Sequence, residues 1–153
     1  MKNIAILGTG MVGDVLGTKL VLLGHKVMMG SRTENNEKAL AWKNKNGTLA
    51  SNGTFADAAA FGEIVFNCTS GKVSLEALQL AGRENLQGKI LVDVANPLDF
   101  SKGMPPTLTI CNTDSLGEVI QRQFPDVRVV KALNTMNCQL MVNPGFLKEP
   151  GNV

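Results

Sequence analysis

Residues 3–33, NIAILGTGMVGDVLGTKLVLLGHKVMMGSRT, predict a strand, a glycine-rich turn, a helix and a second strand in unbroken order. The apolar run Asn3–Leu7 suits a strand buried on both faces, and Gly8, Gly10 and Gly13 after it form the pattern G-x-G-x-x-G. The first glycine allows a tight turn, the second lets backbone amides approach a pyrophosphate, and the third lets the helix pack closely on the strand. Because a helix N-terminus attracts anions, the stretch predicts a dinucleotide-binding βαβ unit.

The residues around the glycine pattern supply the context that a glycine pattern alone lacks. Val12, Leu16, Leu20 and Leu23 recur at helical spacing and predict one apolar face, and Gly24 is expected to end the helix. Glycines also collect in ordinary turns, but a strand before them and an amphipathic helix after them favour the dinucleotide-binding interpretation of this pattern.

The end of the second predicted strand indicates which nicotinamide cofactor is bound. A site for NAD has an Asp or Glu there to accept the ribose 2′-hydroxyl, whereas this chain has Ser31, Arg32 and Thr33. A charge-assisted bond from Arg32 to a 2′-phosphate is worth about 1.5–3 kcal/mol, which predicts a preference for NADP of roughly ten- to a hundredfold. Two alternatives stay open: Ser31 caps the next helix while Arg32 is only solvated, or Glu34 serves NAD.

Two segments resemble a known family. GTGMVGDVLGTKLVLLGHKVMMGSRT at 8–33 and VVKALNTM at 129–136 are similar to the NADP oxidoreductases that work with the deazaflavin coenzyme F420, and to the cytosolic reductase domain of membrane metalloreductases. The resemblance implies hydride transfer between NADPH and a deazaflavin or flavin-type acceptor, with Thr9, Ser31 and Arg32 holding the 2′-phosphate. The family often adds a basic residue near position 36, where this chain has Asn36; Lys38 is a candidate substitute.

Composition agrees with one domain over residues 1–153. The chain has 44% apolar residues and a net charge of +2, and no basic stripe supports nucleic-acid binding. No run is apolar and long enough for a signal peptide or membrane span, so we expect a cytoplasmic protein without membrane partners. Cys68, Cys111 and Cys138 are odd in number and widely spaced, which indicates neither a disulfide framework nor a zinc site.

The rest of the chain continues the alternation of strands and helices. We expect helices over 35–46, 54–61, 73–81 and 115–124, and strands over 63–68, 89–95 and 127–133. Such alternation predicts an α/β fold of the Rossmann type, with a doubly wound and mainly parallel sheet.

Ligands of such sheets bind at the carboxyl ends of the strands, where small and polar residues follow the predicted strands. Each of these loops also has a structural explanation, because Thr-Ser-Gly and Asn-Pro are common in turns, Asn134 is able to bond local backbone, and Cys68 completes an apolar strand. The full set of candidate cofactor-binding residues is Gly8, Thr9, Gly10, Met11, Val12, Gly13, Ser31, Arg32, Thr33, Cys68, Thr69, Ser70, Asn96, Pro97 and Asn134.

No proton-transfer apparatus is recognisable in the sequence, and no metal-ligand spacing is either. Catalytic residues therefore stay unassigned. Hydride transfer to a flavin-like ring requires mainly that the two rings meet in a dry cleft, which favours a coenzyme-to-coenzyme reductase over an alcohol dehydrogenase. The alternative is an NADP(H)-binding sensor or partner-docking module that turns nothing over.

Residues 142–153, VNPGFLKEPGNV, are rich in Pro and Gly, and no closing helix is expected there. Family members continue further, so we expect a shortened variant, a fragment, or a half-site completed by another subunit. Leu140, Met141, Val142, Phe146 and Leu147 need burial, and we expect a homodimer with 138–153 at or near its interface. The alternative is that this segment folds back over its own sheet.

Overall fold

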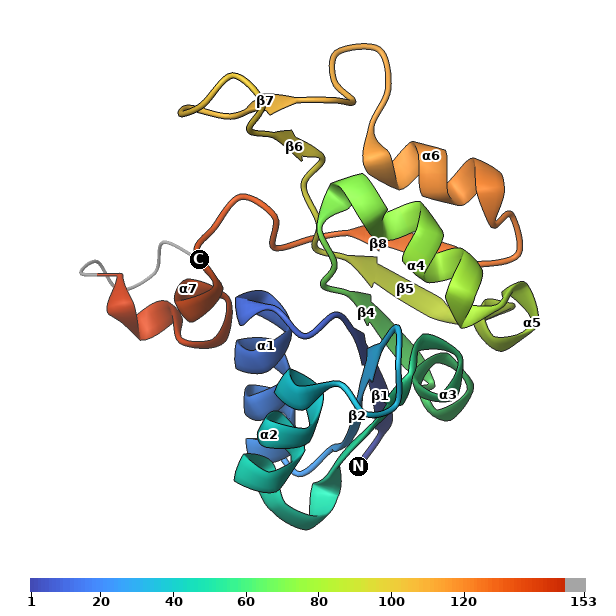
Figure 1. Cartoon of the computed structure of the whole chain (residues 1–153), viewed down its shortest axis with the longest axis vertical. Helices are drawn as coiled ribbons and strands as arrows, with labels where there is room; N and C mark the ends of the chain where they lie inside the picture. The colour runs from blue at the N-terminus through green and yellow to red at the C-terminus, as the bar shows by residue number, and fades with distance from the viewer. Residues whose placement is uncertain (148–153) are drawn as a thin grey trace.

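A six-stranded parallel sheet carries helices on both faces in the computed structural model, which describes residues 1–147 (Figure 1). Its strands are β1 (Asn3–Leu7), β2 (Lys26–Ser31), β3 (Ala50–Thr54), β4 (Ile64–Asn67), β5 (Ile90–Asp93) and β8 (Arg128–Lys131). Their order in space is β3-β2-β1-β4-β5-β8, and every neighbouring pair is parallel. The chain therefore winds outward from β1 in both directions, which confirms the predicted doubly wound α/β fold.

The helices divide between the two faces of the sheet. They are α1 (Met11–Leu22), α2 (Glu37–Asn46), α3 (Phe55–Phe61), α4 (Ser74–Ala81), α5 (Arg83–Leu86), α6 (Leu116–Gln123) and α7 (Cys138–Val142). One apolar core joins α3, α4, α5 and α6 to the sheet, and a second joins α1 and α2 to the opposite face (Figure 1). Gly17 of α1 makes room for Trp42 of α2, because a Cβ at Gly17 would lie 2.9 Å from the Trp42 ring.

Several predicted elements are confirmed, with shifts at their ends. The expected helix over 54–61 is α3, and Thr54 is its N-cap: its hydroxyl accepts the Asp57 N–H while the Asp57 carboxylate accepts the Thr54 N–H. The alternative in which Ser31 caps the next helix is wrong, since Asn36 caps α2 by accepting the Ala39 N–H at 3.1 Å. Leu23 is also not on the buried face of α1, because it is the C-cap residue and is 61% exposed.

Two strand regions were not predicted. Ala50–Thr54 forms β3, an edge strand paired only with β2. The strands β6 (Leu98–Asp99) and β7 (Thr107–Leu108) form a small antiparallel hairpin that extends away from the main sheet (Figure 1).

The segment after β8 contains the short helix α7, which ends at Val142, where the stretch expected to lack a closing helix begins. Helix α7 packs against α1 of the same chain, and Met141 and Val142 are partly buried there (Figure 1). Phe146 and Leu147 remain 62% and 41% exposed. Helix α7 thus packs on its own chain, against α1 and not directly over the sheet. Residues 148–153 lie outside the described residues, and the homodimer stays a prediction.

Candidate functional site

The glycine turn lies between β1 and α1 at the carboxyl edge of the sheet. Gly8 has φ +117°, and a Cβ there would lie 2.7 Å from the Cys68 carbonyl oxygen. A Cβ at Gly13 would lie 2.2 Å from the Gly8 carbonyl oxygen, so only glycine lets α1 approach this closely. Gly10 differs, because its Cβ would meet no protein atom within 4 Å. The space beside Gly10 is therefore open for a ligand at the N-terminus of α1, where no side chain caps the amides.

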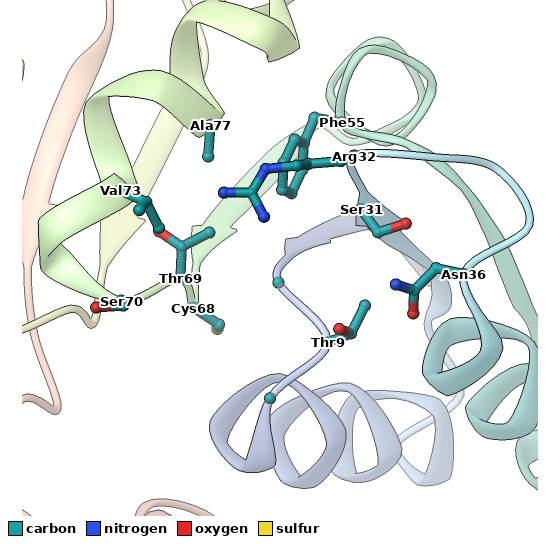
Figure 2. Close-up of a pocket in the computed structure, with 12 residues that line it drawn as sticks. Thr9, Ser31, Arg32, Asn36, Phe55, Cys68, Thr69, Ser70, Val73 and Ala77 are labelled. Carbon is teal, nitrogen blue, oxygen red and sulfur yellow. The ribbon is translucent and has the colours of Figure 1, made fainter.

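A first cavity of about 230 Å³ opens directly in front of this turn (Figure 2). It extends from the glycines past the end of β2 to the loop after β4 and the start of α4. Its lining residues are Gly8, Thr9, Gly10, Ser31, Arg32, Asn36, Phe55, Cys68, Thr69, Ser70, Val73 and Ala77. The apolar side chains of Phe55, Val73 and Ala77 border a slot at one end, toward which the Arg32 guanidinium points, and the polar side chains of Thr9, Ser31 and Asn36 lie at the other end (Figure 2).

Arg32 lies across the mouth of the first cavity. Its guanidinium points toward α4, where its Nε lies 3.5 Å from Glu76 Oε1, and both side chains are more than half exposed (Figure 2). Ser31 is buried, and its hydroxyl donates to the Thr33 carbonyl at 2.6 Å. The predicted anion-binding residues Thr9, Ser31 and Arg32 are therefore together in one cavity, whereas Thr33 is outside its lining.

Asn36 also lines the first cavity, but its Oδ1 is engaged as the cap of α2. Lys38, the candidate basic substitute, lies instead in a neighbouring cavity between α1 and α2, beside Lys45 and Trp42. This cavity shares Thr9 and Gly10 with the first. In this conformation Arg32 is thus the cationic side chain that lines the first cavity.

A second cavity of about 290 Å³ shares the residues Cys68, Thr69 and Ser70 with the first. It lies over the carboxyl ends of β4, β5 and β8, next to α1 and α7. Its further lining residues are Val12, Val94, Ala95, Asn96, Leu98, Phe100, Asn134, Met136 and Met141. Because the two cavities share one wall, an elongated ligand can run from the glycine turn into the second cavity.

Asn96 and Asn134 bond to each other in the second cavity. The Asn96 Nδ2 donates to the Asn134 carbonyl at 2.8 Å, and the Asn134 Nδ2 donates to the Asn96 Oδ1 at 3.1 Å. Pro97, the neighbour of Asn96, is buried and outside the lining, with its carbonyl accepting the Thr109 N–H. Two of the three predicted residues in these loops therefore lie in the cavity.

Cys68 borders both cavities as a buried thiol. Burial, with a smaller contribution from nearby Asp93, raises the pKa of Cys68 to about 12. The protonated thiol is a poor nucleophile, so the structure favours the packing interpretation of this cysteine over a reactive one. Met11 is 71% exposed and lines neither the first nor the second cavity, but it lines the cavity between α1 and α2 together with Thr9 and Gly10.

Behind the loops lies a polar row that sequence reasoning missed. Asn67, Asp93 and Lys131 occupy matching register positions on β4, β5 and β8, and the first two are fully buried. The signal was present in the sequence, because EIVFN, ILVD and RVVK each end an apolar run with one polar residue. Asp93 also bonds the loop after β5, because its Oδ1 accepts the Ala95 N–H at 3.2 Å.

Within residues 1–147, no group of three or more His, Cys, Asp or Glu side chains is placed to hold a metal ion. Over the same residues, none of the helices has both the length and the apolar character needed to span a bilayer.

Comparison with known proteins gives three informative matches. The family model for NADP oxidoreductase, coenzyme F420-dependent, matches residues 3–97. Metalloreductase STEAP3 of Rattus norvegicus is 30% identical over 135 residues, and the match covers 88% of this chain but only 25% of that protein. A crystal structure of a proposed F420-dependent NADP reductase from Arthrobacter sp. FB24 shares 53% identity with a TM-score of 0.88, covering 95% of this chain and 68% of that one.

A structure of an oxidoreductase candidate from Pseudomonas putida KT2440 has a TM-score of 0.69 at 17% identity, covering 91% of this chain and 42% of that chain. At that identity the likeness concerns the fold alone. The chain spans about a quarter of the length of the curated metalloreductase that it matches.

Proposed function

Because the chain belongs to the coenzyme F420-dependent NADP oxidoreductase family, we propose that it binds NADP(H) and transfers a hydride between NADPH and a deazaflavin or flavin-type acceptor. The observation that carries the proposal is the first cavity, in which the open space at Gly10 and the Arg32 guanidinium share one pocket. The pyrophosphate would lie on the amides at the start of α1, and the 2′-phosphate would lie between Thr9, Ser31 and Arg32. The adenine ring would fill the slot of Phe55, Val73 and Ala77.

The nicotinamide would extend past Thr69 and Ser70 into the second cavity, since these residues line both spaces. There the apolar side chains of Leu98, Phe100 and Met136 would cover the face on which an acceptor ring stacks. The hydride would leave nicotinamide C4 with its electron pair and join the acceptor ring, and water would supply the proton that completes the reduced acceptor.

The lining of the second cavity supports a ring acceptor over a carbonyl. Its titratable side chain is Cys68, and the pKa of this thiol is raised to about 12. Reduction of a ketone or aldehyde calls for a proton donor beside the carbonyl oxygen, whereas transfer between two planar coenzymes depends mainly on their placement.

The test is oxidation of NADPH by the purified protein with coenzyme F420, FMN, FAD and small carbonyl compounds as separate acceptors. We expect turnover with a deazaflavin or flavin and none with the carbonyls. Gly10→Ala is the matched control, because its methyl group meets no protein atom but occupies the proposed pyrophosphate space. Tight NADPH binding without turnover of any acceptor would replace the proposal with the alternative of a binding module.

A further inference from the structure

Three polar residues form a continuous row under the loops of the second cavity. Asn67 is in register with Asp93, and Asp93 is in register with Lys131, so the three side chains stand side by side on the face covered by α4 and α6. The preceding residues on this face, Val65, Leu91 and Val129, form an apolar row. The polar row is thus the boundary between the core and the strand ends.

The row is fully connected by hydrogen bonds. Asn67 Nδ2 donates to Asp93 Oδ1 at 2.8 Å, and Lys131 Nζ lies 2.8 Å from Asp93 Oδ2. Lys131 Nζ also donates to the Ala95 carbonyl, while Asp93 Oδ1 accepts the Ala95 N–H at 3.2 Å. Ala95 is therefore held at both its backbone N–H and its C=O.

The other end of the row holds the loop after β4. Asn67 Oδ1 accepts the Thr69 hydroxyl at 2.7 Å and the Thr69 N–H at 3.3 Å. Ser74, also fully buried, accepts from Asn67 Nδ2 at 3.0 Å and donates to the Ser70 carbonyl at 3.2 Å. A bond from the Gly71 N–H to the Asn96 carbonyl then joins this loop to the next one.

We propose that Lys131 is a positioning residue for the nicotinamide end of the cofactor, acting through Asp93 and the Ala95 carbonyl on Thr69 and Asn96. Lys131 itself is absent from the lining of both cavities, so the proposed role is indirect, through the residues that Lys131 bonds. Burying a carboxylate costs free energy because the charge loses its hydration. Apolar side chains would fill the same space without that cost, as Val65, Leu91 and Val129 do two residues earlier on the same strands. What the charged row adds is a set of bonds to the backbone of the two loops that line the second cavity.

The proposal rests on the proposed function. Two ligands distinguish a failure of the positioning role of Lys131 from a failure of NADP(H) binding itself. Adenosine 2′,5′-diphosphate would fill only the first cavity, whereas NADPH would fill both. Loss of positioning should weaken NADPH while leaving adenosine 2′,5′-diphosphate unchanged. General loss of structure should weaken both in parallel, and failure of the unaltered protein to bind either ligand would contradict the proposed function instead.

The variants are Lys131→Met, Lys131→Arg and the charge-neutral pair Asp93→Asn with Lys131→Met. We expect the pair to fold even if Lys131→Met alone does not, because it leaves no unpaired buried carboxylate. Lys89→Met is the matched control, because Lys89, which immediately precedes β5, also donates from Nζ to backbone carbonyls, those of Ala59 and Ala60 in α3, and neither of these residues lines the first or the second cavity. Titration of both ligands is combined with the nicotinamide fluorescence of bound NADPH.

For Lys131→Met and the double variant we expect about a tenfold loss of NADPH affinity, the scale of one or two lost hydrogen bonds, with reduced fluorescence of the bound nicotinamide. The affinity for adenosine 2′,5′-diphosphate should stay within about twofold, and Lys131→Arg should restore most of the difference. Parallel weakening of both ligands, or an unchanged NADPH affinity and fluorescence in the double variant, would overturn the proposal.

Discussion

Asn96 and Asn134 hold each other by two hydrogen bonds, although they are 38 positions apart in the sequence. The pair ties the loop after β5 to the loop after β8 inside the second cavity. The preceding residue, Leu133, has φ +64°, a conformation that costs a non-glycine residue about 1–2 kcal/mol. The Asn134 carbonyl, which accepts from Asn96, directly follows this turn, so the pair helps hold the loop in that conformation.

The first prediction concerns the coupling of this pair. Asn96→Ala removes both hydrogen bonds, whereas Asn134→Ala removes only the bond between the two side chains, because the other is accepted by the Asn134 backbone carbonyl. Each variant should lower the free energy of unfolding, Asn96→Ala by about 1–2 kcal/mol and Asn134→Ala by about 1 kcal/mol. The double variant should lose about 1 kcal/mol less than the sum, since the side-chain-to-side-chain bond can be lost only once. Urea unfolding measures all four proteins, and strict additivity would show that the two side chains do not interact.

The second prediction concerns Glu76, which competes for Arg32 at the mouth of the first cavity. Exposed ion pairs are worth about 0–1 kcal/mol, so Glu76→Gln should tighten NADPH binding by up to roughly fivefold. NADH, which lacks the 2′-phosphate, should bind as before. Titration of both coenzymes checks this, and weaker NADPH binding by Glu76→Gln would mean that Glu76 supports the cofactor instead of competing with it.

The third prediction concerns Cys68. Because its pKa is raised from 9.0 to about 12, the thiol contributes stability that is complete below pH 9.0 and is lost as the pH rises toward 12. The free energy of unfolding should therefore fall more steeply above pH 9.0 in the unaltered protein than in Cys68→Ala.

Alkylation at neutral pH gives an independent check on the same thiol. Cys111 is exposed and should react first, while Cys68 should stay unmodified until the protein unfolds. Rapid modification of Cys68 in the folded protein, located by peptide mass spectrometry, would contradict the assigned pKa shift.

The fourth prediction contrasts two glycines of the same turn. Gly10→Ala should leave the thermal unfolding midpoint nearly unchanged and abolish most NADPH binding, because its Cβ meets only open space in the protein. Gly13→Ala should destabilise the fold itself, since its Cβ would lie 2.2 Å from the Gly8 carbonyl oxygen. If Gly10→Ala bound NADPH as tightly as the unaltered protein, the pyrophosphate would not lie on this turn.

The parts of the structure that follow from local pattern could be predicted from the sequence. The G-x-G-x-x-G turn and the capped helix α3 depend on residues close together in the chain. The edge strand β3 was missed because its residues ASNGT are polar and turn-forming, and pairing with β2 alone makes them a strand.

The same holds for the candidate site: residues next to a recognisable strand end could be placed from the sequence. Ser31 and Arg32 follow a strand and reach the first cavity as expected. The cap of α2 at Asn36 is a local bond to the Ala39 N–H, three residues along the chain. The contacts within the polar row of Asn67, Asp93 and Lys131 depend instead on strand register and on partners far away in sequence. Those relationships appear only when the sheet is assembled.

The central claim is that the first cavity binds the 2′-phosphate of NADP(H), and the most direct measurement is titration of the unaltered protein and Arg32→Ala with NADPH and NADH. The unaltered protein should bind NADPH at least about tenfold more tightly than NADH, and Arg32→Ala should remove most of that difference, as expected for one lost charge-assisted bond. Equal affinity of the unaltered protein for the two coenzymes, or a preference that survives in Arg32→Ala, would contradict it.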